Sequence, residues 1–310
     1  MSYFFKRGSF EERKNEIVFH GKEIINTNPI SGEQKRINMY GEILFDGKFY
    51  DGSISYDIEL SDINKDTRFG FLLNNKNINN IETTFQIGLR NDFAGSSLEY
   101  FDGRQWNYKV IAGEQNMLQK KKLYNVSINL RGNSISLYVN KICLFTSDSY
   151  VQSSGGYGIF ICNAFPSIIS NIKNSISKPT IFSIMKFEKD FDDLYNEVIT
   201  PSANKFGYQS LRADECYTTT EIIDDIIKEI SHASIIIADI TMDNSNVFYE
   251  LGYAHALHKP TILLADVNKR SVLPFDISGY RTIFYTNSIG GKKEIEEKLN
   301  KYIENITNQN

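Results

Sequence analysis

Cysteine and histidine are scarce in this chain, which has three cysteines and four histidines among 310 residues. The cysteines (Cys143, Cys162 and Cys216) are odd in number and unevenly spaced, so they indicate reduced, mostly buried thiols of a cytoplasmic protein and not a disulfide framework. His255 and His258 are three residues apart, but no nearby cysteine joins them. We therefore expect packing or surface histidines and no metal site.

Long apolar runs and an excess of positive charge are also absent. No stretch approaches the roughly 18 apolar residues that a membrane-spanning helix needs, and residues 1–16 lack the apolar core of a signal peptide. The formal net charge is −4 and the pI is near 5.7. We therefore expect neither a membrane anchor nor a nucleic-acid partner.

The chain is long enough for two domains, and its two parts differ in pattern. Residues 15–175 contain short strands with alternating apolar side chains, clearest at 53–60, 124–130 and 134–139. An Arg-Gly-Asn turn at 131–133 separates the last two strands and marks a hairpin. Many such strands joined by Asn/Gly turns predict an antiparallel β-sandwich.

The order of these strands resembles a concanavalin-A-like or laminin-G-like jelly roll. The resemblance rests on four segments: FDGKFYDGSISYDIEL, RFGFLL, YNVSINLRGNSISLYVN and GGYGIFICN. It implies a jelly-roll domain over residues 1–176 that senses a ligand or drives assembly, with a glycan or another small molecule as the candidate ligand. Trp106 lies among tyrosines and polar residues, which suits sugars or bases, but packing in the sandwich is the interpretation we favour.

Residues 177–310 alternate apolar strands with amphipathic helices. This order predicts an α/β domain with a flavodoxin-like parallel sheet and right-handed crossovers. Pro201 falls within one helix, where we expect a bend or a break. The expected strands are 180–187, 208–211, 235–238, 261–265 and 281–285, and the expected helices are 189–206, one capped by Thr219, 247–258 and 292–306.

The middle of this second part holds the strongest candidate for a functional residue. An unbroken apolar strand, Ile235–Ala238, ends at Asp239, and the next helix is expected to be capped at residue 245 or 246. Glu250 lies on that helix, outside the capping-box position and without a basic residue three or four positions later. A carboxylate on a largely apolar helix costs free energy unless something binds it, so functional and structural roles are both open.

Four segments resemble the nucleoside 2-deoxyribosyltransferase-like proteins, which are relatives of the Toll/interleukin-receptor (TIR) domains. They are residues 238–241 (ADIT), 246–254 (NVFYELGYA), 259–260 (KP) and 274–276 (PFD). The resemblance covers about the last 130 residues and implies that 177–310 form a catalytic domain. It also implies that Glu250 attacks or stabilises the anomeric carbon of a ribosyl group, with Asp239 near the sugar.

The same resemblance implies a set of substrate contacts. Arg212 follows the second strand of this domain and is a candidate phosphate partner, with a surface ion pair as the alternative. The transferases carry a second acidic residue about six positions before the glutamate, where this chain has Asn244 beside Asp243. This departure favours hydrolysis over base exchange. The expected substrate contacts are Lys186, Phe187, Arg212, Asp214, Asn244, Asn246 and Asp276.

The leading hypothesis is an N-ribosyl hydrolase of TIR-like kind, an NAD glycohydrolase that releases nicotinamide. NAD is then a substrate, and no cofactor is expected. An unregulated NADase would harm its own cell, so we expect a controlled, homo-oligomeric effector that resembles those of bacterial antiviral defence. A nucleoside or nucleotide 2-deoxyribosyltransferase or N-glycosidase is the second hypothesis. The third is a module that binds a nucleotide without cleaving it.

Overall fold

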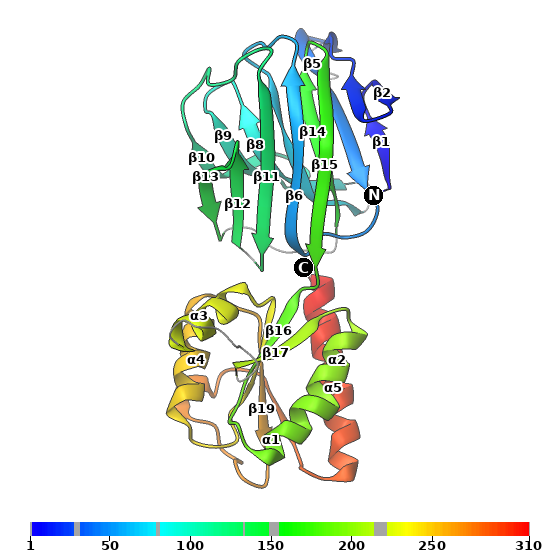
Figure 1. Cartoon of the computed structure of the whole chain (residues 1–310). Helices are drawn as coiled ribbons and strands as arrows, with labels where there is room; N and C mark the ends of the chain where they lie inside the picture. Colours follow the sequence, from blue (N-terminus) through cyan, green and yellow to red (C-terminus); the bar gives the residue numbers. More distant parts are fainter. Residues whose placement is uncertain are drawn as a thin grey trace. The chain divides into compact units, whose positions relative to one another are not determined.

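The computed structural model describes residues 2–27, 32–78, 81–132, 134–148, 155–213 and 222–309. The chain divides into two compact units, one of Met1–Leu130 with Ser134–Ile176 and the other of Arg131–Asn133 with Ser177–Asn310 (Figure 1). Each unit encloses hydrophobic clusters of its own, so each is described by itself.

The first unit is a β-sandwich of two antiparallel sheets (Figure 1). One sheet has the order β1-β5-β14-β7-β8-β9-β10, with β4 paired to β5, and the other has the order β13-β12-β11-β6-β15-β3-β2. The expected antiparallel sandwich is confirmed, with β11 and β12 as neighbours. The strands are β1 (Tyr3–Arg7), β2 (Phe10–Arg13), β3 (Glu16–Phe19), β4 (Glu23–Thr27), β5 (Gln34–Phe45), β6 (Asp51–Leu60), β7 (Arg68–Ile78), β8 (Ile81–Arg90), β9 (Ser96–Phe101), β10 (Trp106–Ala112), β11 (Leu123–Arg131), β12 (Ser134–Val139), β13 (Ile142–Ser147), β14 (Gly156–Asn163) and β15 (Ser167–Ser177).

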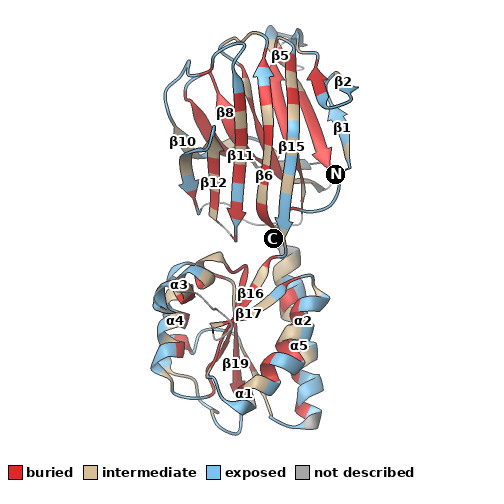
Figure 2. Cartoon of the chain, in the orientation of Figure 1, coloured by how far each residue is buried: buried red, intermediate tan, exposed pale blue. Residues whose placement is uncertain are grey.

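The core of the sandwich follows from the period-two alternation of its strands. On β6, Ile54, Tyr56 and Ile58 are fully buried between the sheets, while the residues between them are partly exposed (Figure 2). Trp106 is only partly buried, on the edge strand β10, where its ring packs on Phe101. The expectation of mostly buried thiols is wrong for one cysteine: Cys162 is buried, but Cys143 is exposed on the edge strand β13.

The second unit is built on a five-stranded parallel sheet with the order β17-β16-β18-β19-β20. Counted along the chain, this is the 2-1-3-4-5 order of flavodoxin-like sheets, as expected. The strands are β16 (Thr180–Ile184), β17 (Gln209–Arg212), β18 (Ile235–Asp239), β19 (Thr261–Asp266) and β20 (Thr282–Tyr285), and the helices are α1 (Lys189–Leu194), the π-helical η1 (Tyr195–Ile199), α2 (Thr200–Lys205), α3 (Ile222–His232), α4 (Ser245–Ala256), the 3₁₀ turn η3 (Phe275–Ile277) and α5 (Ile289–Gln309).

Helices cover both faces of this sheet because its strands alternate between two apolar cores. Residues of α1, η1, α2 and α5 pack against Ile181, Ile235 and Ile262 on one face. Residues of α3 and α4 pack against Phe182 and Ile236 on the other. This doubly wound arrangement leaves the carboxyl ends of the strands as the edge where loops and helix starts meet.

Pro201 produces the expected irregularity, but without a break in the helix. Its nitrogen has no hydrogen to donate to the preceding turn, and the backbone is π-helical over Tyr195–Ile199, immediately before it. The helical path from α1 through η1 to α2 is therefore continuous up to Lys205.

Two kinds of feature are absent from the described part of the chain. None of its helices is both long enough and apolar enough to cross a membrane. Likewise, its histidine, cysteine, aspartate and glutamate side chains form no group of three or more that could hold a metal ion.

Candidate functional site

Glu250 lies in the second turn of α4, the helix that starts at the carboxyl edge of the sheet just after β18. Its side chain is half-buried, and within the described residues it has no hydrogen bond or ion pair. Burial raises the pKa of the Glu250 carboxyl from 4.5 to about 7. A carboxylate held in this way is stabilised by any ligand that brings positive charge to it.

The start of α4 differs from the expected one. Its N-cap is Asn244, not residue 245 or 246, because the Asn244 side chain accepts hydrogen bonds from the backbone N–H groups of Asn246 (2.9 Å) and Val247 (3.3 Å). The helix therefore begins two residues earlier than expected. Glu250 lies beyond the first turn, so the helix dipole does little to stabilise its charge.

Glu250→Gln is expected to stabilise the protein at high pH but not at low pH. Because the pKa of Glu250 is higher in the folded than in the unfolded chain, protonation of this carboxyl stabilises the fold below about pH 4.5. That stabilisation is lost as the pH rises to about 7. The gain should reach about 1–2 kcal/mol above pH 7, because water screens part of this half-buried group. Urea unfolding at about pH 5 and about pH 8 measures it. The exposed Glu304→Gln on α5 is the control, and an equal gain at both pH values would contradict the raised pKa.

Asp239 ends β18 and is buried at the centre of a polar network. One of its carboxylate oxygens accepts the backbone N–H of Thr241 (2.9 Å), and the other accepts the hydroxyl of Tyr285 at the end of β20 (2.8 Å). Burial raises the pKa of Asp239, while the hydrogen bonds from Thr241 and Tyr285 lower it. Burial, and then the charge of Asp239, raise the pKa of Tyr285. Asp239 therefore joins the ends of β18 and β20, and Tyr285 is a site residue that the sequence did not indicate.

Thr241 extends this network to the neighbouring strand. Its hydroxyl accepts the backbone N–H of Asp266 (2.8 Å), the last residue of β19, and lies 3.5 Å from the Tyr285 hydroxyl. The carboxyl ends of β18, β19 and β20 are thus held together by hydrogen bonds. Such a fixed edge suits a site whose groups must stay in position.

Arg212 ends β17, but it is not free for a phosphate. Its guanidinium is buried and lies 2.7 Å from the carboxylate of Asp192 on α1. It also lies over the rings of Tyr195 (4.8 Å) and Phe187 (5.6 Å). A phosphate that reached Arg212 would have to compete with Asp192 for it.

Most of the other expected contacts lie apart from these networks, but the ring of Phe187 lies beside Arg212. Lys186 forms an ion pair with Glu188, and the Phe187 ring is 55% exposed just after β16. Asn246 on α4 and Asp276 in η3 are both exposed, and Asp214 lies outside the described residues. Of the expected contacts, Arg212 and Phe187 lie beside each other, and Asn244 caps the N-terminus of α4.

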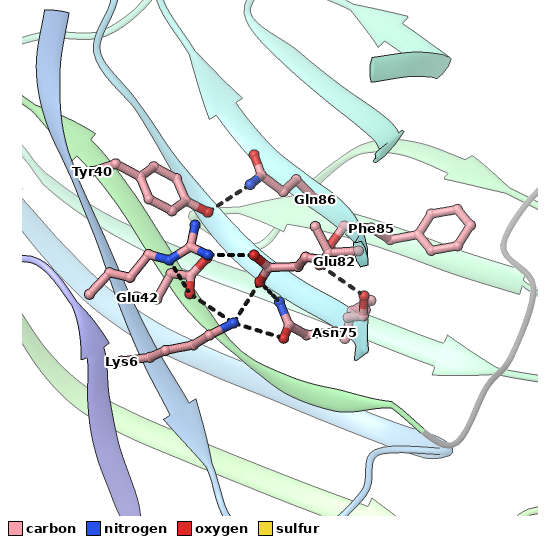
Figure 3. A network of polar contacts seen from close by, with 10 residues as sticks. Lys6, Tyr40, Glu42, Asn75, Glu82, Phe85 and Gln86 are labelled. Carbon is pink, nitrogen blue, oxygen red and sulfur yellow. Dashed lines mark hydrogen bonds and ion pairs between the residues drawn. The ribbon is translucent and has the colours of Figure 1, made fainter. Parts of the chain in front are cut away.

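A second polar surface lies on the face of the eight-stranded sheet that points away from the core. Lys6 on β1 meets Glu82 on β8 (2.5 Å), although β5, β14 and β7 lie between their strands, so the sheet curls strongly (Figure 3). Nearby, the Gln86 amide donates to the Tyr40 hydroxyl (2.7 Å). The Gln86 carbonyl oxygen is buried without a hydrogen-bond partner in the described structure.

Beside this network the same face has a pocket of about 380 Å³. Tyr40, Arg68 and Tyr108 line it, together with Phe93 and the buried Arg90. The Arg90 guanidinium lies over the rings of Phe93 (4.0 Å) and Tyr108 (5.3 Å). Aromatic faces and planar hydrogen-bonding groups therefore meet in one hollow.

Comparison with solved structures gives likenesses of fold to the N-terminal unit. No protein-family description matches the chain, and no curated sequence matches it. The carbohydrate-binding module CBM66 from Bacillus subtilis is similar over 56% of this chain and 94% of its own, with 11% identity and a TM-score of 0.44. The Bacillus licheniformis β-glucanase covers 57% and 92%, with 11% identity and a TM-score of 0.37. The Caenorhabditis elegans galectin LEC-6 covers 48% and 96%, with 16% identity and a TM-score of 0.31.

Proposed function

We propose that the C-terminal unit is an N-ribosyl hydrolase that cleaves the nicotinamide–ribose bond of NAD, with Glu250 as the catalytic carboxylate. The observation that supports this most is the half-buried Glu250 carboxyl, which has no partner in the described structure and a pKa raised to about 7. Such a group favours a ligand that supplies positive charge. The cationic nicotinamide ring and the oxocarbenium-like state that follows its departure both do so.

The reaction needs only one carboxylate for its difficult step. The bond between the anomeric carbon and the ring nitrogen breaks, its electron pair leaves with nicotinamide, and the leaving group becomes neutral without a proton from the protein. Glu250 stabilises the resulting positive charge on the ribose or traps it as a covalent ester. Water then adds to the anomeric carbon, which frees the Glu250 carboxylate if the ester has formed, and the water loses a proton to solvent. Asn244 in place of a second carboxylate is compatible with this scheme.

The substrate is tested by incubating the purified full chain with NAD and separating nicotinamide from ADP-ribose by chromatography. Release of both products in equal amounts supports the hydrolase. Deoxynucleosides and nucleotides, offered with and without a second base, test the transferase alternative in the same assay. If every substrate stays intact, even after the protein is concentrated or cross-linked into assemblies, the NADase proposal fails. Nucleotide binding by calorimetry would then favour the binding module.

We also propose that the N-terminal unit regulates this activity, as in an effector that is switched on by a ligand or by self-assembly. The polar pocket beside Tyr40 is the candidate ligand site, and a sugar is the ligand that its lining favours. The exposed ring of Tyr108 can stack on the apolar face of a sugar, while Arg68 and Tyr40 offer hydrogen bonds to hydroxyl groups.

Tyr108→Ala is expected to weaken sugar binding about tenfold, because it removes one of the two exposed aromatic rings of this pocket, the other being Phe93. An array of neutral mono- and oligosaccharides, followed by calorimetry on the best binder, measures the effect. Tyr249→Ala, which removes a tyrosine of similar exposure from α4, is the matched control and should leave sugar binding unchanged. A chain that binds no sugar on the array would rule out this ligand class.

A further inference from the structure

A second hollow of the N-terminal unit lies between its two sheets and is larger and mainly apolar. It has a volume of about 410 Å³, which is in the range of small-molecule sites. Its walls come from β8, β9 and β10 of one sheet and from β11, β12 and β13 of the other. The lining includes Leu89, Ala112, Met117, Tyr124, Val139 and Leu144.

This pocket lies beside the last strands of the two sheets. β10 and β13 end their sheets, and the segment that joins β10 to β11 lines the pocket with them through Gly113, Met117, Leu118 and Lys122. Leu89 and Tyr124 belong to the buried core, so the inner wall of the pocket is the core itself. When an apolar ligand covers solvent-accessible apolar surface of this kind, the free energy of the system falls.

One wall of the pocket is adaptable. Met117 lines the pocket with a side chain that is 54% exposed, and it lies beside Gly95 and Gly113. A Cβ atom added to Gly95 would approach the Met117 sulfur to 2.6 Å, so the two glycines leave room for this side chain. Methionine has three rotatable bonds and a polarisable sulfur, and it adjusts easily to the shape of a ligand.

The polar end of the pocket carries positive charge. Lys122 is the one charged side chain among the described lining residues. It is exposed, its ammonium group lies 5.6 Å from the centre of the Tyr124 ring, and it ends a run of three lysines from Lys120 to Lys122. Lys120 is paired with Asp62 at 3.5 Å, outside the pocket. The pocket thus combines an apolar interior with one cation at its rim.

We propose that this pocket binds an amphipathic carboxylate, a fatty-acid-like molecule whose chain enters between the sheets and whose carboxylate meets Lys122. The apolar walls select an alkyl chain over a sugar or a nucleotide, and the single lysine selects an anionic head group over an ammonium head group. Lys122 is exposed, so the head group stays close to water. This site is independent of Glu250 and of the sugar pocket.

Binding is tested on the full chain with dodecanoate as the probe, by calorimetry and by protection of a methionine from oxidation. Met117 lines the pocket and is exposed, whereas the exposed Met242 lies in the other unit and serves as an internal reference. We expect dodecanoate to bind once per chain and to slow the oxidation of Met117 by hydrogen peroxide about tenfold, as read by mass spectrometry. Acetate should not protect Met117, and dodecanol should bind about tenfold more weakly than dodecanoate.

Two substitutions separate the apolar and charged parts of the site. Ala112→Phe places a ring in the pocket and should abolish binding, while Lys122→Glu should weaken it at least tenfold. Lys120→Glu is the matched control and should bind normally. Circular dichroism and the melting temperature establish that each variant is folded.

Saturable dodecanoate binding that Ala112→Phe leaves intact would overturn the proposal, and so would binding without protection of Met117. Dimerisation of the free chain through this edge, seen by light scattering and lost in Ala112→Phe, would show that a second copy covers the pocket and would also overturn it. Because none of these measurements uses NAD, failure here leaves the proposed hydrolase untouched.

Discussion

Glu250→Gln is expected to reduce nicotinamide release from NAD by about a thousandfold or more. The amide has nearly the same size as the carboxyl group but cannot carry the negative charge that stabilises an oxocarbenium-like ribose. Because Glu250 has no hydrogen bond or ion pair in the described structure, the replacement breaks no internal contact there. The loss should therefore appear mainly in kcat, while the affinity for NAD, measured by calorimetry, falls by a smaller factor, because the lost charge also attracts the cationic nicotinamide ring.

The pH dependence of the wild-type enzyme provides a second test of the catalytic role of Glu250. The ionised form of Glu250 is the active one, so kcat/KM should rise with pH and level off above the pKa of about 7 in the free enzyme. The cationic nicotinamide ring lowers the pKa of Glu250 in the enzyme–NAD complex, so kcat should rise with pH over a lower pH range than kcat/KM does. The control Glu304→Gln should keep full activity. Retained activity in Glu250→Gln would place the catalytic group elsewhere.

Local patterns were sufficient to predict most of the fold. The alternation on β6 and the unbroken apolar run of β18 each predict the kind of strand that forms, because burial on one face or on two leaves a different periodicity. The order of strands and helices then limits the second unit to a doubly wound parallel sheet. The N-cap of α4 was misplaced, because Asn244, Ser245 and Asn246 are all good caps and only the backbone geometry chooses among them.

The candidate site could be predicted only in part. Glu250 stands out in the sequence because its helix is apolar and supplies no partner. The partner of Asp239 does not stand out, because Tyr285 lies 46 residues away and reaches it only through the packing of β18, β19 and β20. The pairing of Arg212 with Asp192 on α1 depends in the same way on how a helix lies beside a strand end. Contacts of this kind leave no periodic signal.

Asp239→Ala is expected to lower the free energy of unfolding by about 2–4 kcal/mol. The substitution leaves the Tyr285 hydroxyl and the Thr241 N–H without their buried acceptor, and each such loss costs about 1–3 kcal/mol. Tyr285→Phe removes only one of these bonds and should cost about 1–3 kcal/mol. The double variant should be little worse than Asp239→Ala alone, because the two residues share one interaction. Urea unfolding of all four proteins measures the cycle, and full additivity would contradict it.

The same pair of variants decides whether Asp239 also contacts the ribose. Tyr285→Phe keeps the Asp239 carboxylate in place, whereas Asp239→Ala removes it. If Asp239 is only a brace for the strand ends, the two variants should have similar kcat and KM for NAD, even though they lose different amounts of stability. If it orients the sugar as well, Asp239→Ala should raise KM or lower kcat about tenfold beyond Tyr285→Phe, at a temperature where both are fully folded. Equal kinetics in the two variants would limit Asp239 to its structural role and leave Glu250 as the only carboxylate of the proposed reaction.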